Sequence, residues 1–150
     1  MPLSRRITPA SKSTSSKFVP LNGEHNSWEV YWALVEPRLK ERARGFEYIF
    51  DHLTSLSHAP VIVETGTLRE PHNYEGDGCS TKLFDTWLKY NNGKLFSIDI
   101  DPNAVHEAAQ HCKRASIHLS DSVEWLSKCD EEIDVLYLDS FNIDDFLTSK

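Results

Sequence analysis

The stretch Val61-Ile62-Val63-Glu64-Thr65-Gly66 decides the fold. Its three consecutive β-branched residues predict a short strand buried on both faces, which is typical of a parallel sheet. The glycine that follows allows a sharp turn and lets the backbone approach a ligand closely. The stretch therefore predicts an α/β protein whose informative residues lie where this strand ends.

The same succession of strand, polar loop and helix recurs towards the C-terminus. Further strands are expected at 94–100, 116–119 and 133–138, and a helix is expected at 80–90. Asp101 and Asp121 are suited to cap two further helices. Four strands that alternate with helices predict a mostly parallel sheet with flanking helices and right-handed crossovers.

The chain divides into three segments. Residues 1–20 hold four basic residues, five serines and no acid. They predict a disordered basic tail, with a mitochondrial transit peptide as the alternative. Residues 21–58 are expected to form an N-terminal helical segment that begins near Ser27 and is kinked or divided at Pro37. Its apolar stripe comprises Trp28, Trp32, Val35 and Leu39. Residues 59–150 form the α/β domain.

Composition limits the functional classes. The chain has 150 residues, a net charge of −7 and 39 % hydrophobic residues, so it can build a core and is not disordered throughout. No apolar run is long enough for a membrane span. The acidic charge argues against a nucleic-acid partner. Three cysteines without a metal-binding spacing (Cys79, Cys112 and Cys129) favour a reducing compartment, and we expect the cytoplasm.

Acidic residues stand at or just after the ends of all four expected strands. They are Glu64, Asp99, Asp121 and Asp139. Ligands of such sheets bind at the carboxyl ends of the strands, where the strand order reverses. Carboxylates accept hydrogen bonds from ribose hydroxyls and from an exocyclic amine. The four acids therefore predict a binding edge.

The loop after the first strand contains further candidates. Gly76, Gly78 and the helix start at Ser80 could direct backbone N–H groups towards a carboxylate or phosphate. Ser80 itself is best explained as a helix cap. His72 is a candidate active-site base, and Cys79 beside the helix start is a weaker candidate for a thiol of lowered pKa.

The segments 61–66, 96–101, 120–122 and 136–139 together resemble the class I S-adenosylmethionine-dependent methyltransferases, over about residues 61–141. The resemblance implies a Rossmann-like sheet of order 3-2-1-4 and S-adenosyl-L-methionine as cofactor. It places the turn at Gly66 against the methionine part, Asp99 on the ribose and Asp121 on the adenine amine. Asp139 would line the methyl-transfer site.

The resemblance yields a full set of expected site residues. The implied cofactor-binding residues are Glu64, Gly66, Thr67, Gly78, Ser80, Asp99, Ile100, Asp121, Ser122 and Asp139. The candidate catalytic residues are Asp139 and His72. Because Asp99 would lie at an open cleft, its replacement should weaken binding and change thermal stability little. No metal ligand is assigned, and magnesium would need ligands from beyond residue 150.

The expected activity is methylation of an oxygen on a small molecule or sugar. The residues after Asp139 do not include the proline pair that follows the corresponding acid in family members that methylate amino groups of nucleic acids. The acidic net charge of the chain also favours an acceptor other than nucleic acid. The family's three further strands are not present, so we expect a cofactor half or fragment that shows negligible methyl transfer alone. The last expected strand would then be an apolar edge that favours a homo-oligomer.

Two other functions remain open. The first is an NAD-binding oxidoreductase, because the separation of Gly78 from Asp99 is close to the spacing between phosphate glycines and a ribose acid. Against it, Gly78 lies well after the end of the first strand, whereas the glycines of a dinucleotide-binding fingerprint follow their strand immediately. The negative charge of Glu64 would also repel a pyrophosphate. The second is a non-catalytic remnant that binds a cofactor or a partner chain.

Overall fold

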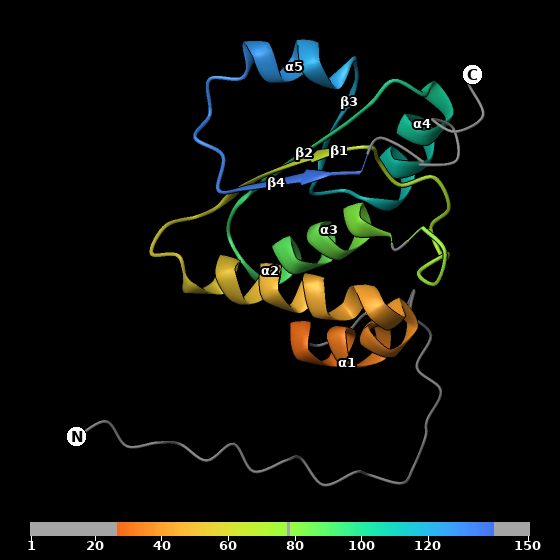
Figure 1. Cartoon of the computed structure of the whole chain (residues 1–150), viewed down its shortest axis with the longest axis vertical. Helices are drawn as coiled ribbons and strands as arrows, with labels where there is room; N and C mark the ends of the chain where they lie inside the picture. The colour runs from red at the N-terminus through yellow and green to blue at the C-terminus, as the bar shows by residue number, and fades with distance from the viewer. Residues whose placement is uncertain (1–26, 78, 140–150) are drawn as a thin grey trace, which may run out of the picture.

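The sheet consists of four parallel strands. The computed structural model describes residues 27–77 and 79–139. Its strands lie in the order β3-β2-β1-β4 (Figure 1). Their bounds are β1 (Val61–Thr65), β2 (Lys94–Asp99), β3 (Ser116–Leu119) and β4 (Val135–Leu138). The expected α/β class, the parallel pairing and the order 3-2-1-4 are confirmed.

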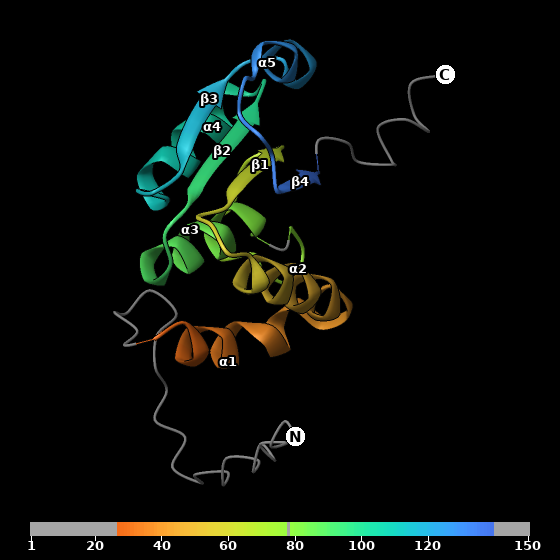
Figure 2. The same ribbon diagram turned by 90° about the vertical axis from the view of Figure 1, so that its left-hand side faces the viewer.

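Helices cover the two faces of the sheet unequally. On one face lie α3 (Ser80–Tyr90) and α4 (Pro102–His111), whereas α5 (Ser122–Lys128) lies over the other face (Figures 1 and 2). On the same side of the sheet as α3 lie α1 (Trp28–Leu39), the short 3-10 helix η1 (Lys40–Arg42) and α2 (Ala43–Ser55), with α1 farthest from the sheet (Figure 2). Among the described helices, none has the length and apolarity needed to cross a membrane.

An aromatic core fixes the N-terminal helices to the α/β domain. Phe46 of α2 lies 6.2 Å from the ring of Phe84 on α3 and 5.5 Å from that of Tyr137 on β4. Phe50 of α2 packs on the same Phe84 ring at 5.7 Å. Burying such large rings is a major source of folding free energy. The N-terminal segment is thus part of the same core as the sheet.

The inner face of α1 differs slightly from the expected stripe. Tyr31, Val35 and Leu39 are its buried residues, and Trp28 and Trp32 are only partly buried. Ser27 caps the helix, because its hydroxyl accepts the Val30 N–H at 3.2 Å. The helix does not end at Pro37, which sits in its last turn. It ends two residues later, before Lys40, whose positive φ of 54° turns the chain.

Candidate functional site

The carboxyl end of β1 is the centre of the candidate site. From β1 the chain builds β2 and β3 on one side and returns to β4 on the other, so the strand order reverses there. The Asp139 N–H donates to the Thr65 carbonyl at 2.9 Å and holds the ends of β1 and β4 together. Such reversal points are where ligands bind in open parallel sheets. Two cavities that share Gly66 and Arg69 lie at this edge.

The first cavity, which we call the acidic cavity, lies at the ends of β2 and β3. It is lined by Gly66, Arg69, Ile98, Asp99, Ile100, Asp101, Ser120, Asp121 and Ser122. Its volume of about 330 Å³ falls within the usual range for small-molecule sites. Five expected binding residues, Gly66, Asp99, Ile100, Asp121 and Ser122, are therefore brought together here.

Asp99 has a structural role as well as a place in the acidic cavity. Its Oδ2 accepts the Thr67 N–H at 2.9 Å, and its Oδ1 accepts the Asp101 N–H at 2.9 Å. A carboxylate oxygen can accept more than one hydrogen bond, so both oxygens keep accepting capacity. Because Asp99 also fixes the chain after β1 and β2, the expectation that its removal leaves stability almost unchanged does not fit this geometry.

The acidic cavity is lined by an apolar residue, Ile100, as well as by a second acid, Asp121. The side chain of Ile100 is 71 % exposed, which is unusual for isoleucine and leaves an apolar surface next to Asp99. Asp121 caps α5, with its Oδ1 accepting the Glu124 N–H at 3.0 Å. Its Oδ2 accepts no hydrogen bond from the described residues. The cavity thus combines carboxylate acceptors with one exposed apolar side chain.

The second cavity, which we call the mixed-charge cavity, lies where β1 and β4 end. It is lined by Arg42, Gly66, Thr67, Leu68, Arg69, Gly76, Asp77, Cys79, Ser80 and Asp139, and its volume is about 100 Å³. Gly66 has a φ of 86°, a left-handed conformation that favours glycine, and its N–H donates to the Ile98 carbonyl at 2.7 Å. At Gly66, which lines both cavities, the shared wall is formed by backbone without a side chain, whereas Arg69 contributes a side chain to it.

Asp139 lies in the mixed-charge cavity with two arginines. Partial burial raises the pKa of Asp139 above its ordinary value, although the charges of Arg42 and Arg69 act in the opposite direction. Neither arginine forms an ion pair with another described residue. The cavity therefore holds cationic and anionic groups that are not neutralised by direct contact.

Glu64 does not face either cavity, contrary to the expectation from the sequence. Its side chain is fully buried, and its carboxylate accepts hydrogen bonds from the hydroxyls of Ser80, Thr81 and Ser97. The Thr81 and Ser97 bonds are both 2.6 Å long. Burial raises the pKa of Glu64 to about 7, although the three hydroxyls oppose this shift. Glu64 therefore joins β1, β2 and α3 from inside.

The helix start at Ser80 differs from its expected form. Cys79 is the N-cap residue of α3, in a left-handed conformation and without a side-chain cap, whereas the Ser80 hydroxyl donates to Glu64. The Cys79 thiol donates to the Glu70 carbonyl, and burial raises its pKa to about 12. A lowered thiol pKa is thus contradicted. Gly78 lies outside the described residues.

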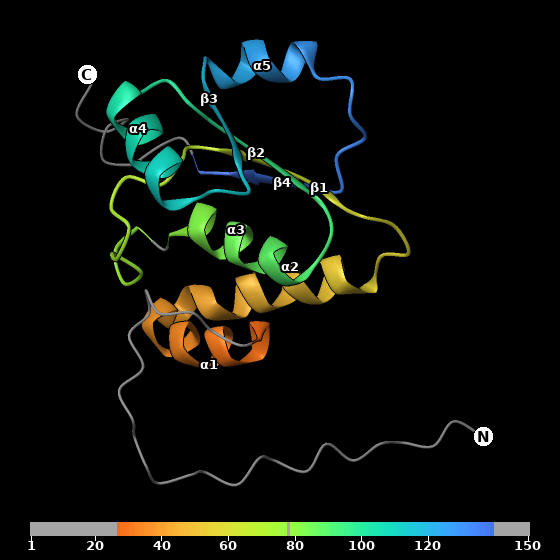
Figure 3. The ribbon, with the colours of Figure 1, turned by 180° about the vertical axis from the view of Figure 1, so that it is seen from behind.

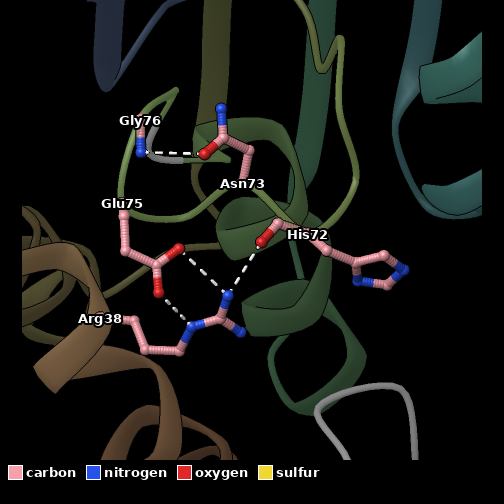
Figure 4. Close-up of polar contacts among 5 residues, drawn as sticks. All are labelled: Arg38, His72, Asn73, Glu75 and Gly76. Atoms are coloured by element: carbon pink, nitrogen blue, oxygen red, sulfur yellow. Dashed lines mark hydrogen bonds and ion pairs between the residues drawn. The ribbon is translucent and has the colours of Figure 1, made fainter.

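His72 is not brought to Asp139. Its imidazole is exposed and lies 6.4 Å from the ring of His111 on α4, and it lines neither cavity. Its backbone carbonyl accepts a hydrogen bond from Arg38 (Figure 4). The structure thus offers no geometric support for His72 as a base at this edge.

Sequence reasoning did not assign several residues that line the cavities. Arg42 comes from η1, far from Asp139 in sequence, and no local motif marks it. Arg69 and Asp77 lie in the loop after Gly66, and no local motif marks either residue. Asp101 caps α4 as expected, since it accepts the Asn103 N–H at 2.9 Å, but it also lines the acidic cavity.

None of the protein-family models, curated proteins or solved structures with which the chain was compared matches it. The site must therefore be interpreted from its own geometry. Within residues 27–77 and 79–139, no group of three or more His, Cys, Asp or Glu side chains is placed to hold a metal ion.

Proposed function

We propose that the chain binds S-adenosyl-L-methionine across the two cavities and serves as a methyltransferase. The observation that carries the proposal is the acidic cavity, in which carboxylates from the ends of β2 and β3 flank the exposed side chain of Ile100. Asp99 and Asp121, which the family resemblance implies for the ribose and the adenine amine, thus line the same cavity. A nucleoside needs hydrogen-bond acceptors for its hydroxyls and amine, and an apolar surface for its base.

The donor and acceptor groups of the acidic cavity fit a nucleoside. Asp99 uses both oxygens to hold backbone N–H groups but retains lone pairs that could accept two ribose hydroxyls. Asp121 retains an oxygen for an exocyclic amine while it caps α5. Ile100 offers apolar surface for a purine ring. The adenosine part of the cofactor would therefore occupy this cavity.

The mixed-charge cavity fits the amino-acid end of the same molecule. That end carries one carboxylate and one ammonium group, and the cavity offers two guanidinium groups and two carboxylates. Arginine is well suited to bind a carboxylate through paired hydrogen bonds. Gly66 and Arg69 lie in the walls of both cavities, so a ligand that spans them would pass the backbone turn at Gly66 and the side chain of Arg69.

The chain's own residues would act mainly by positioning. The bound cofactor supplies an electrophilic methyl group, and transfer then needs an acceptor oxygen held in line with it. Asp139 directly follows β4 and lines the mixed-charge cavity, so it would lie near this position. Its raised pKa makes it a better proton acceptor than an ordinary aspartate, so it would accept the proton of an acceptor hydroxyl.

The proposed acceptor is an oxygen of a small molecule or a sugar. The support comes from the sequence after Asp139, which lacks the proline pair of amino-methylating relatives of the resembled family, and from the acidic charge of the chain. We place this activity in the cytoplasm, since the cysteines form no disulfide among the described residues.

An NAD-binding oxidoreductase is the rival function. One argument against it no longer applies, because the Glu64 carboxylate is enclosed by hydroxyls and would not meet a pyrophosphate. The other argument stands. The dinucleotide fingerprint passes directly from strand to helix, whereas β1 ends at Thr65 and α3 begins only at Ser80. The geometry of the loop favours the methyl donor.

Calorimetry with S-adenosylmethionine, S-adenosylhomocysteine and NAD⁺ tests the proposal. We expect both sulfur-containing ligands to bind and NAD⁺ not to bind. Asp121→Asn keeps a capping oxygen for α5 but removes the charge, so affinity for S-adenosylhomocysteine should fall roughly tenfold. Asp51→Asn on α2 is the matched control and should bind as the wild type does. Binding of NAD⁺ alone would refute the proposal.

A further inference from the structure

The loop between β1 and α3, residues 66–79, forms much of the mixed-charge cavity. Leu68, Arg69, Gly76 and Asp77 of this loop line the cavity. Figure 3 shows the loop beside the start of α3, between α4 and the N-terminal helices. The described part of the loop contains no helix or strand, so its position must depend on contacts with other elements.

Arg38, near the end of α1, supplies the strongest of these contacts (Figure 4). Its Nε donates to Glu75 Oε1 at 2.7 Å, and its Nη2 donates to Glu75 Oε2 at 3.1 Å. The same Nη2 donates to the His72 carbonyl at 2.9 Å. One guanidinium group thus binds two points of the loop, and its planar fork fixes their relative orientation.

A buried tyrosine pair strengthens the same junction. Tyr74 is 2 % exposed, and its hydroxyl lies 3.1 Å from that of Tyr31 on α1. The Arg38 guanidinium also lies over the Tyr74 ring, 4.9 Å from its centre. The loop residue between two Arg38 contacts is therefore inserted into the core beside α1.

The loop also carries a tight internal turn that leads into the cavity wall. Asn73 Oδ1 accepts the Gly76 N–H at 3.1 Å (Figure 4). The Asn73 carbonyl also accepts the Asp77 N–H at 3.0 Å. A Cβ atom on Gly76 would come within 2.5 Å of the Asn73 side chain. Glu75, which binds Arg38, thus lies inside this turn, directly before Gly76 and Asp77.

We propose that Arg38 is a positioning residue of the ligand site. It latches the loop through Glu75 and His72 and so holds Gly76 and Asp77 in the cavity wall. The N-terminal helices would then be part of the site, and Arg42, four residues further on, lines the cavity itself. An exposed ion pair adds little to global stability, so the latch should act on loop geometry. The identity of the affected ligand rests on the proposed function.

Two measurements on the whole chain test the latch, namely hydrogen exchange of the amides of residues 73–77 and calorimetric affinity for S-adenosylhomocysteine. Arg38→Gln and Glu75→Gln should each speed exchange and weaken affinity on the order of tenfold, with melting almost unchanged. The double variant should be no worse than Arg38→Gln alone, because Arg38→Gln already removes the interaction with Glu75. Arg44→Gln on α2 is the matched control and should change neither readout.

Arg38→Lys separates orientation from charge. Lysine keeps the positive charge but lacks the planar fork, so it should resemble Arg38→Gln rather than the wild type. Gly76→Ala, whose methyl group would displace the Asn73 side chain that accepts the Gly76 N–H, should weaken affinity with the Arg38 latch intact.

The outcomes distinguish the latch from the proposed function. A wild-type chain that binds no S-adenosylhomocysteine would refute the proposed function, whereas faster exchange in Arg38→Gln would still support the latch. Unchanged exchange in Arg38→Gln would overturn the latch whatever the ligand does. Faster exchange with undiminished affinity, in a chain that binds the ligand, would overturn the positioning role.

Discussion

Glu64 is a fully buried carboxyl group that is stabilised by hydroxyl donors. Ser80, Thr81 and Ser97 donate to it, and burial nevertheless raises its pKa to about 7. Charge in a protein interior is costly unless it is well solvated by hydrogen bonds. Both protonation states are therefore populated near neutral pH, and the stability of the junction between β1 and α3 should depend on pH.

Glu64→Gln should flatten this dependence. In the wild type the folded pKa lies above the unfolded value, so deprotonation favours unfolding. The free energy of unfolding should thus fall as pH rises from about 4.5 to about 7, by at most about 1.4 kcal/mol per pH unit, and level off above. Urea unfolding of both proteins between pH 5 and 8 measures the difference. Equal pH dependence would show that Glu64 keeps an ordinary pKa.

Asp99→Ala should weaken both binding and folding. It removes the acceptors of the Thr67 and Asp101 N–H groups, and each unsatisfied donor costs about 1–3 kcal/mol when it cannot reach water. Affinity for S-adenosylhomocysteine should fall by about 1.5–3 kcal/mol, the scale of hydrogen bonds to a charged group. Chemical unfolding and calorimetry check the two effects. Lower stability with unchanged affinity would leave Asp99 a structural role only.

The residues at the strand ends show what sequence can and cannot reveal about a site. The sequence placed Asp99 and Asp121 at one edge, and both line the acidic cavity. The prediction that Glu64 lies at this edge was wrong, because successive side chains of a strand point to opposite faces of the sheet. Glu64 shares a face of β1 with Ile62, which packs in the core, and three hydroxyl groups from distant segments complete its environment. Position at a strand end does not fix the direction of a side chain.

At the scale of elements, β4 is one of the two edge strands of the described sheet. In the order β3-β2-β1-β4, it and β3 each have a described neighbour on one side only. Leu136 and Leu138 are 45 % and 69 % exposed, on the face opposite the core. An exposed apolar strand edge favours pairing with another chain. We therefore expect the chain to self-associate through β4.

Leu138→Lys tests this surface. A lysine on an edge strand opposes association through charge and hydration, so multi-angle light scattering should show a smaller mass than for the wild type. Tyr48→Lys on α2, which replaces a side chain that is 78 % exposed away from the sheet, is the control and should not change the mass. A wild type that stays monomeric at high concentration would contradict the expectation.

The elements themselves were largely predictable from local pattern, and their contacts were not. Apolar spacing, caps and β-branched runs predicted all four strands and the helices, because these depend on nearby residues. The contacts of α1 with the β1–α3 loop join residues far apart in sequence, such as Arg38 and Glu75. The sequence around Arg38 does not indicate Glu75 as its partner, and the sequence around Glu75 does not indicate Arg38. The contact of α1 with the loop could therefore be found only from the structure.

At the scale of the whole molecule, the candidate site is lined by residues from distant parts of the described chain. The ends of β1, β2 and β3 supply the acidic cavity, while η1, the loop and the end of β4 supply the mixed-charge cavity. Gly66 and Arg69 lie in both walls. Under the proposed function, one ligand would span both cavities, with its nucleoside at Asp99 and its amino-acid end at Arg42 and Asp139.

Amide chemical-shift mapping with S-adenosylhomocysteine tests this claim most directly, because it reports the contacted residues as well as binding. We predict saturable shifts at Gly66, Thr67, Ile100 and Ser122, together with shifts at Asp77 and Asp139. The amide chemical shift of Trp125 on α5, which lines neither cavity, should not change. Saturation without shifts at the two cavities, or shifts confined to the surface near Trp125, would contradict the account.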